Sequence, residues 1–236
     1  MITLLISVLA LGFLLGMKHS FETDHIVSIS TIVSNPRAIK KSAFIGILWG
    51  IGHTLTLFIV GLIVLAFRVA IPERIALSFE LIVGIMLVIL GINVVYKINK
   101  ERIHIHFHKH YNLEHIHFHS HKAVQISNKI FSNHQHKHLP LKQALLIGII
   151  HGLAGSASLS LLVLTTINSL WIGLVYLILF GIGSIIGMVI VSIALSLPFQ
   201  LFTKRVNNSS ILLQFCSGVL SIVIGFWVIY EVVAIF

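Results

Sequence analysis

Six apolar runs occupy most of this chain, and each is long enough to cross a lipid bilayer as an α-helix. Hydrophobic residues make up 57% of the 236 residues and charged residues only 10%, with a mean hydropathy of +1.02. A soluble domain of this composition would have too few polar side chains to cover its surface. We therefore expect an all-α polytopic membrane protein with six transmembrane helices. The expected spans lie at about 3–33, 43–66, 76–98, 141–166, 170–197 and 211–235.

The first run is too long for one straight crossing and contains a polar motif, His19-Ser-Phe-Glu-Thr-Asp24-His25. A carboxylate and two imidazoles inside a bilayer cost several kcal/mol unless partners compensate, and such groups commonly mark ion pathways. On a straight helix these three side chains would point in different directions, at about 100° per residue. We therefore expect the first helix to break or bend near the motif, as the discontinuous helices of transporters do. The alternative is that only a subset of these residues binds an ion at once.

The basic residues are distributed unevenly between the connectors. Thirteen Lys and Arg residues lie in the first, third and fifth connectors, whereas the second and fourth contain only Arg68 and Arg74. The positive-inside rule places the odd-numbered connectors in the cytoplasm and both termini on the extracytoplasmic side. We expect the protein to lie in the plasma membrane. Topology therefore explains the formal charge of +9, and no nucleic-acid partner is needed.

The two halves of the chain share a pattern of glycine, histidine and tyrosine at an offset of 131 to 134 residues. The equivalent pairs are Gly16 and Gly148, His19 and His151, Gly50 and Gly181, His53 and Ser184, Gly84 and Gly218, Gly91 and Gly225, and Tyr96 and Tyr230. Three spans per half is an odd number, so the halves would have inverted topology, which is typical of secondary transporters with a midplane site. We expect three-helix repeats at 1–98 and 141–236, separated by a loop at 99–140. The alternative is that unrelated helices share small residues for close packing.

Four histidines lie within the expected spans, and inverted symmetry would bring them to the centre of the bundle with Asp24. Imidazole binds Ni²⁺, Co²⁺, Cu²⁺ and Zn²⁺, and a carboxylate neutralises part of the charge. The predicted metal ligands are His19, Asp24, His25, His53 and His151. Glu22 lies three residues from both histidines of the motif, which predicts a supporting or proton-coupling role. For any one histidine alone, a hydrogen-bonded group that stabilises helix packing is the simpler alternative.

The expected loop at 99–140 contains eleven of the fifteen histidines. They are His104, His106, His108, His110, His115, His117, His119, His121, His134, His136 and His138. Alternation with period two would place imidazoles on one face of an extended strand, with Ile and Phe on the other. Such tracts bind transition metals with weakly specified geometry. We interpret the loop as a cytoplasmic metal buffer or sensor and expect it to be disordered.

Three segments together resemble the nickel/cobalt permease superfamily, which includes the NiCoT uptake permeases, related efflux proteins and urease-associated transmembrane proteins. They are the His-x₄-Asp-His motif at His19, Trp49-Gly-Ile-Gly-His53-Thr-Leu-Thr, and His151-Gly-Leu-Ala-Gly-Ser-Ala-Ser-Leu. Phe180-Gly-Ile-Gly-Ser-Ile-Ile-Gly-Met188 also looks like the family's fifth span. The resemblance implies metal binding by His19, Asp24 and His25, and less directly by His53. The uptake permeases usually have eight spans, and a long His-rich loop on six spans is more similar to the efflux branch.

These features predict transport of Ni²⁺ or Co²⁺ through a midplane site, with uptake slightly favoured over efflux. The ion is cargo, no cofactor is permanently bound, and a cytoplasmic metallochaperone is a candidate partner. A haem or electron-transfer protein would need paired histidines on facing spans, which His19 and His151 could supply, but Asp24 would then have no role. A metal sensor that does not transport is a further alternative. Nothing indicates an enzyme, since His-Glu-x-x-His is absent and there is no second aspartate.

Overall fold

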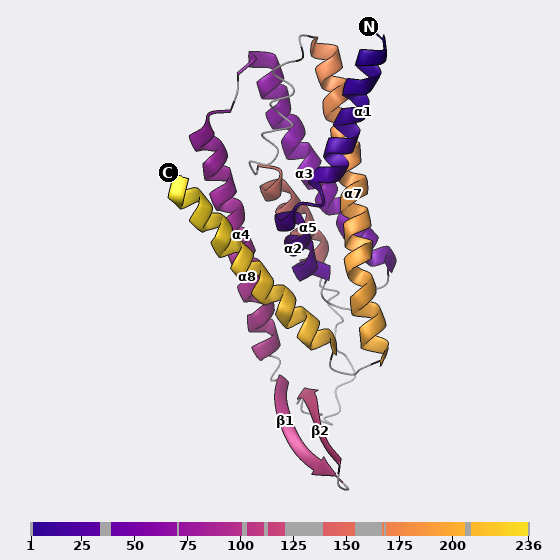
Figure 1. The fold of residues 1–236 in the computed structure, drawn as a ribbon, viewed down its shortest axis with the longest axis vertical. Helices are drawn as coiled ribbons and strands as arrows, with labels where there is room; N and C mark the ends of the chain where they lie inside the picture. Colours follow the sequence, from indigo (N-terminus) through magenta and orange to yellow (C-terminus); the bar gives the residue numbers. More distant parts are fainter. Residues whose placement is uncertain are drawn as a thin grey trace, which may run out of the picture.

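The computed structural model of the protein describes residues 2–33, 39–69, 71–100, 103–110, 113–120, 139–153, 167, 169–205 and 209–235. This part of the chain is helical apart from one two-stranded sheet (Figure 1). The helices are α1 (Ile2–His19), α2 (Thr23–Val33), α3 (Ile39–Phe67), α4 (Glu73–Lys100), α5 (Leu139–His151), α7 (Leu170–Arg205) and α8 (Ser209–Ile235). The strands are β1 (Ile103–His110) and β2 (Leu113–Ser120).

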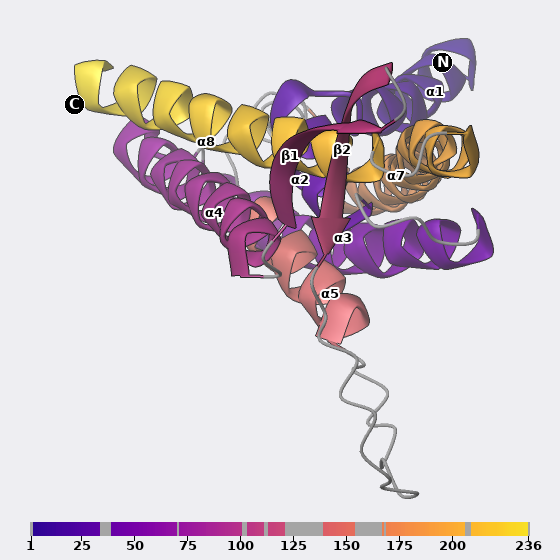
Figure 2. The same cartoon turned by 90° about the horizontal axis from the view of Figure 1, so that it is seen from below.

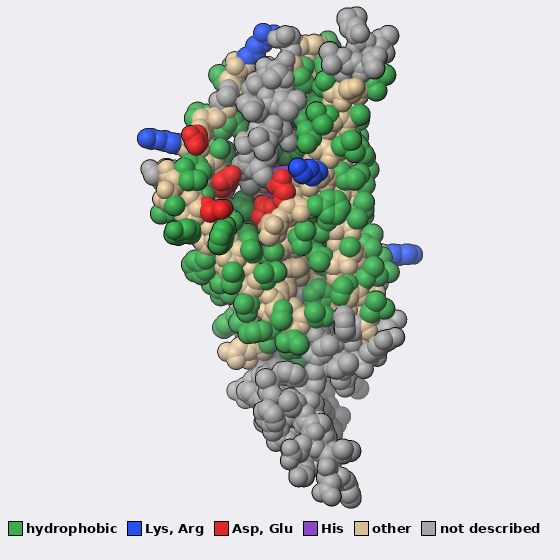
Figure 3. Space-filling view, in the orientation of Figure 1, with side chains coloured by type: hydrophobic (Ala, Val, Ile, Leu, Met, Phe, Trp, Pro, Cys, Tyr) green, Lys and Arg blue, Asp and Glu red, His purple; other side chains and the backbone are tan. Residues whose placement is uncertain are grey.

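Four helices, α3, α4, α7 and α8, are long and apolar enough to cross a membrane. Two shorter helices, Ile6–His19 within α1 and Leu141–His151 within α5, are also apolar. Hydrophobic side chains cover most of the face shown in Figure 3, as expected for a surface in contact with lipid. The prediction of a helical multi-pass membrane protein is confirmed at this level. The second part of the predicted span 141–166 lies outside the described residues.

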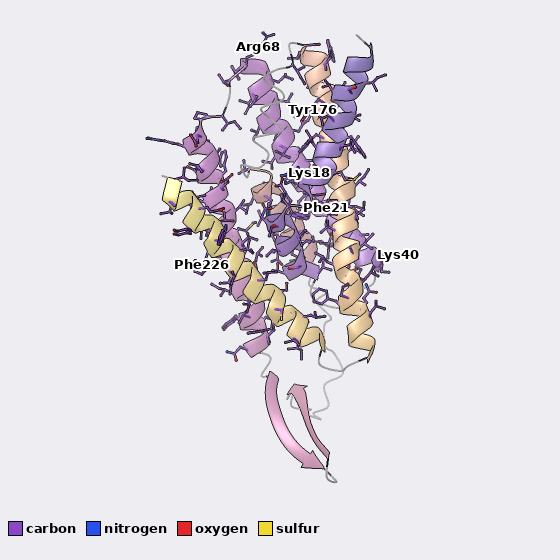
Figure 4. All side chains as sticks on the ribbon, viewed as in Figure 1. Lys18, Phe21, Lys40, Arg68, Tyr176 and Phe226 are labelled. Atoms are coloured by element: carbon purple, nitrogen blue, oxygen red, sulfur yellow. The ribbon has the colours of Figure 1, made fainter. Side chains whose placement is uncertain are left out.

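The predicted break in the first span is confirmed, because α1 ends at His19 and α2 begins at Thr23. Two backbone hydrogen bonds close the turn between them, from Phe21 N to Lys18 O at 3.0 Å and from Glu22 N to His19 O at 3.1 Å. Lys18 and Phe21 mark this junction in Figure 4. Beyond it, α2 is buried along nearly its whole length and contacts α3, α4, α5, α7 and α8.

The helices pack as one row and one pair, with α2 between them (Figures 1 and 2). In the row, α1 packs against α7, α7 against α3, and α3 against α5, while α4 pairs with α8. Along the chain, α1, α4 and α7 run downward in Figure 1, and α3, α5 and α8 run upward. Both termini therefore lie in the upper half of the view, and the hairpin of β1 and β2 lies at the lower end.

The row is held together at glycines that let two backbones approach closely. A Cβ added at Gly16 of α1 would collide with the carbonyl oxygen of Phe180 in α7. In the same way, a Cβ at Gly148 of α5 would collide with the carbonyl oxygen of Trp49 in α3. Small residues at helix interfaces are the usual means of close packing in membranes, where burial of apolar surface gives little driving force.

The predicted extended strands of the His-rich loop are present as the antiparallel pair β1 and β2. Their register places histidines opposite one another in three pairs, His104 with His119, His106 with His117, and His108 with His115. Residues 121–138, which include the four remaining loop histidines that follow the strands, lie outside the described residues. Disorder of the loop as a whole stays a prediction.

Candidate metal centre

The junction of α1 and α2 brings the five predicted ligands together with the help of α3 and α5. His19 is the last residue of α1, Asp24 and His25 lie in the first turn of α2, and His151 is the last residue of α5. His53 comes from the middle of α3. All four imidazoles are buried, while the side chain of Asp24 retains 19% of its exposure. Residues distant in sequence thus meet at one enclosed position.

Asp24 links two of the imidazoles through its two carboxylate oxygens. Its Oδ1 lies 3.0 Å from Nδ1 of His25, and its Oδ2 lies 3.1 Å from Nε2 of His151. A carboxylate only accepts hydrogen bonds, so both imidazoles donate an N–H to it when no ion is bound. The second of these contacts joins α2 to α5, across 127 positions of sequence.

His19 and His53 form a second close contact. Their Nε2 atoms lie 3.1 Å apart, and Glu22 Oε2 lies 3.1 Å from the other ring nitrogen of His19, Nδ1. Two imidazole nitrogens that bind one ion at about 2.1 Å with a right angle between them are separated by about 3.0 Å. A carboxylate on Nδ1 is the usual partner of a histidine that binds metal through Nε2. The predicted supporting role of Glu22 therefore has a geometric basis at His19.

The ring of His25 lies at the centre of the cluster. Ring centroids are 4.5 Å from His25 to His19, 5.1 Å to His53 and 4.4 Å to His151. Trp49 packs against His25 and His151, with ring centroids 5.4 and 5.8 Å away. This enclosure by aromatic rings excludes bulk water and fixes the orientation of the imidazoles.

The ring contacts of Trp49 and Phe180 with the cluster were not among the predictions from the sequence. The ring of Phe180 lies 5.9 Å from that of His19. The repeat pattern contained a signal for both, because Trp49 directly precedes Gly50 and Phe180 directly precedes its equivalent, Gly181. Each aromatic residue also supplies the carbonyl oxygen against which a glycine of a neighbouring helix packs.

Two helix ends make the centre electrostatically suited to a cation. α1 ends at His19 and α5 ends at His151, so the negative ends of both helix dipoles lie at the cluster. Broken helices in transporters use such C-terminal ends to stabilise cations. The carboxylate of Asp24 lies in the first turn of α2, where the positive end of a dipole stabilises it.

Several ring nitrogens of the cluster lack a hydrogen-bond partner within the described part of the chain. They are Nε2 of His25, Nδ1 of His53 and Nδ1 of His151, and all three are buried. A buried polar atom without a partner costs about 1–3 kcal/mol. Nε2 of His25 fits a site that binds a metal ion, together with the short ligand spacings. Nδ1 of His53 and Nδ1 of His151 are on the side of each ring away from its close contact, since Nε2 makes that contact in both.

Acidic side chains extend from the cluster to the surface. Figure 3 shows Asp and Glu side chains gathered around a hollow between the pair α4–α8 and the junction of α1 and α2. Glu80 of α4 interacts electrostatically with Asp24 and with Glu231 of α8. The side chain of Glu22 is 37% exposed. Negative charge of this kind raises the local concentration of cations.

The chain is 35% identical over 227 residues to the urease accessory protein UreH of Bacillus sp. (strain TB-90). The matched region covers 96% of this chain and 92% of that relative. No protein-family model and no solved structure matches the chain. Within the described residues, the structure brings together His19, Asp24, His25, His53 and His151, which belong to the motifs that carry the superfamily resemblance. The chain belongs to the nickel/cobalt permease superfamily, among its UreH-like urease-associated transmembrane proteins.

Proposed function

We propose that the protein carries Ni²⁺ or Co²⁺ across the plasma membrane through the centre formed by His19, Asp24, His25, His53 and His151. The observation that carries this proposal is the convergence of buried metal-ligating groups at a break in a membrane helix. Buried ionisable groups at such positions are costly and mark ion pathways. Membership of a nickel/cobalt permease superfamily agrees with that chemistry.

The donor set favours Ni²⁺ or Co²⁺. Imidazole with one carboxylate suits these ions and also Zn²⁺, whereas Cu⁺ prefers thiolate or thioether ligands. The only cysteine of the chain, Cys216, is exposed on α8 and is not one of these ligands. A bis-histidine haem, for which His19 and His151 were the candidate pair, is disfavoured because Nε2 of His151 lies 3.1 Å from Asp24 Oδ2 and a haem would leave that carboxylate without a role.

The transport cycle that we propose uses two inverted three-helix repeats. The proposal is supported by pairs of equivalent contacts. Where a residue of the first half packs on a residue of the second, the equivalent residue of the second half packs on the equivalent residue of the first. Gly16 packs on the carbonyl of Phe180 and Gly148 on that of Trp49; Gly91 packs on the carbonyl of Gly218 and Gly225 on that of Gly84. Equivalent helices also run in opposite directions in Figure 1. Relative motion of such repeats opens a central site to each side in turn.

Uptake is the direction that we propose. A divalent ion gains about 4.6 kcal/mol per 100 mV on moving toward a negative interior, so uptake needs no further coupling. The relative is named an accessory protein of urease. A chain with that role would supply metal to the cytoplasm, where a metallochaperone would receive it. The termini would then be outside the cytoplasm and the hairpin inside, as the distribution of Lys and Arg predicts.

Export is the second candidate, and the His-rich hairpin favours it. A tract of histidines on the cytoplasmic side would collect ions for removal, as in the efflux branch of the superfamily. Export must act against the membrane potential and therefore needs a coupled gradient, for which Glu22 is the predicted proton-coupling residue. The hairpin is equally suited to buffer or sense ions that have just arrived.

Flux of radioactive Ni²⁺ into right-side-out vesicles with an inside-negative potential tests the proposal. Wild-type protein should accumulate the ion, and Asp24→Asn or His19→Ala should lower accumulation by at least about tenfold, the scale on which metal sites respond to lost ligands or partners. The control is Cys216→Ser, an exposed position on α8 that should transport like wild type. Flux only in inverted vesicles with a proton gradient would establish export, and no flux in either orientation would contradict transport.

A further inference from the structure

The five ligands form two groups rather than one. The first group is His19, His25 and His53, and the second is Asp24, His25 and His151. Within each group the ligand atoms all lie within 4.8 Å of one another. His25 is the member that the two groups have in common. Each group offers three ligands, which leaves positions for water on an ion that prefers more.

The two nitrogens of His25 face different partners. Its Nδ1 lies 3.0 Å from Asp24, a member of the second group. Its Nε2 is buried and has no hydrogen-bond partner among the described residues, which leaves it for the first group. One imidazole can therefore offer a nitrogen to each group without a flip of its ring.

The groups also differ in chemistry and in origin. The first is all imidazole and comes from α1, α2 and α3, which belong to one half of the chain. The second contains a carboxylate and adds His151 from α5, in the other half. An ion that moves from one group to the other therefore passes from a site within the first half to a site between the halves.

We infer that the transported ion occupies two positions in this cluster in turn, one on His19, His25 and His53 and the other on Asp24, His25 and His151. His25 is the ligand that both positions share, with a different ring nitrogen available to each. This inference rests on the proposed function, since it describes steps within the same transport site. Transport requires both positions, whereas binding requires only one.

Three matched substitutions separate the positions. His53→Gln removes a ligand from the first group only, His151→Gln from the second only, and His25→Gln from both. If the two positions have comparable affinity, the loss of either one lowers total binding by only about twofold, because the affinities of alternative sites add. The loss of a ligand from a single five-ligand site would instead weaken binding by about tenfold or more in every variant.

The experiment is equilibrium dialysis of Ni²⁺ against the purified full-length chain in detergent, paired with vesicle flux for each variant. The eleven loop histidines are replaced by glutamine in every sample, so that only the bundle contributes. We expect His53→Gln and His151→Gln to bind Ni²⁺ within about threefold of the parent chain and His25→Gln to bind at least about tenfold more weakly. Flux should be lost in all three. Equal weakening of binding in the three variants would overturn the inference.

X-ray absorption of the Ni²⁺-loaded parent chain tests the inference without any substitution in the bundle. Two alternating positions predict an average of between two and three imidazoles around each ion, whereas a single site built from all five residues predicts four. A count of four would overturn the inference even if a variant fails to fold. Absence of Ni²⁺ binding by the parent chain, or binding without flux, would contradict the proposed function itself and is thereby distinguished from failure of the two-position inference.

Discussion

Histidine occurs in two settings in this protein, inside the helical bundle and along the hairpin of β1 and β2. In the bundle each imidazole is buried and has its own partners, such as Asp24 on His25 and His151, or Glu22 on His19. In the hairpin the backbone register repeats one arrangement three times, with histidine opposite histidine. Histidine thus has a distinct set of partners at each position in the bundle, whereas in the hairpin it occurs in one backbone arrangement that repeats.

Under the proposed function, this difference predicts separate roles for histidine in the bundle and in the hairpin. A cluster enclosed by Trp49, Phe180 and close helix contacts can select an ion by spacing and charge, because its ligands cannot rearrange freely. If the hairpin binds metal as predicted, a ladder of similar pairs would offer capacity, since an ion that leaves one pair could bind the next. We therefore expect the bundle to be sensitive to single substitutions and the hairpin to respond to conditions that affect all its imidazoles together.

The largest expected effect concerns pH and the hairpin. Imidazole binds metal only when neutral, and its ordinary pKa is about 6.5. For an ion held by a pair of such imidazoles, lowering the pH from 7.5 to 5.5 protonates both and weakens binding by about a hundredfold. The measurement is Ni²⁺ bound per chain at the two pH values, in wild type and in the chain whose eleven loop histidines are glutamine. The difference in bound Ni²⁺ between these two chains is the amount bound by the loop histidines.

That difference should be large at pH 7.5 and nearly absent at pH 5.5. Ni²⁺ that stayed bound to the loop histidines at pH 5.5 would contradict the distinction between the two regions. The hairpin would then bind metal through imidazoles shielded from protonation, as an enclosed site does. Magnesium, which binds imidazole poorly, serves as the control ion for nonspecific association.

The next effect concerns the close packing that the bundle needs. Gly148→Ala places a Cβ against the carbonyl oxygen of Trp49, whose ring contacts His25 and His151. Backbone cannot yield as a flexible side chain does, so we expect a loss of about 1–3 kcal/mol in the free energy of unfolding and weaker Ni²⁺ binding by the bundle. Thermal unfolding in detergent, together with Ni²⁺ binding by the chain without loop histidines, measures both effects.

Gly173→Ala is the matched control for this substitution. The atoms nearest to a Cβ at Gly173 are side-chain carbons of Leu65, which can shift. We expect a smaller loss of stability and unchanged Ni²⁺ binding. Equal effects of the two substitutions would show that the approach of α5 to α3 has no special importance for the centre.

The sequence predicted a helical membrane protein, the break in the first span and the set of residues that meet at the centre, whereas the arrangement of six spans as two inverted repeats stays a proposal. These predictions succeeded because hydropathy, the cost of buried charge and the repeat of Gly-x-x-His each constrain the chain strongly. Of the two alternatives that the angular spacing from His19 to His25 left open, the structure shows the break, because α1 ends at His19 and α2 begins at Thr23.

The partition of the ligands between two groups was beyond the sequence. Which nitrogen of His25 faces Asp24 depends on side-chain rotation and on the angle between α1 and α2, and neither leaves a trace in residue spacing. The interaction between Asp24 and Glu80 was hidden for a similar reason, because it arises from the packing of α2 beside α4. Residue types predict which ligands are present, whereas helix packing determines which ligand atoms lie close enough to bind the same ion.

The smallest effect concerns Glu80, which acts on the bundle from a distance. Its carboxylate interacts electrostatically with Asp24, and it belongs to the acidic region around the hollow in Figure 3. Glu80→Gln removes one negative charge from the approach to the centre, so we expect the Ni²⁺ concentration at half-maximal flux to rise by roughly threefold to tenfold, about 0.7–1.4 kcal/mol. The maximal flux should change little, because no predicted ligand is lost. Glu73→Gln, an exposed position at the start of the same helix, is the control and should leave both quantities within about twofold. Equal responses of the two variants would mean that the charge on α4 does not assist the ion toward Asp24, and the selectivity of the bundle would then depend on its enclosed ligands alone.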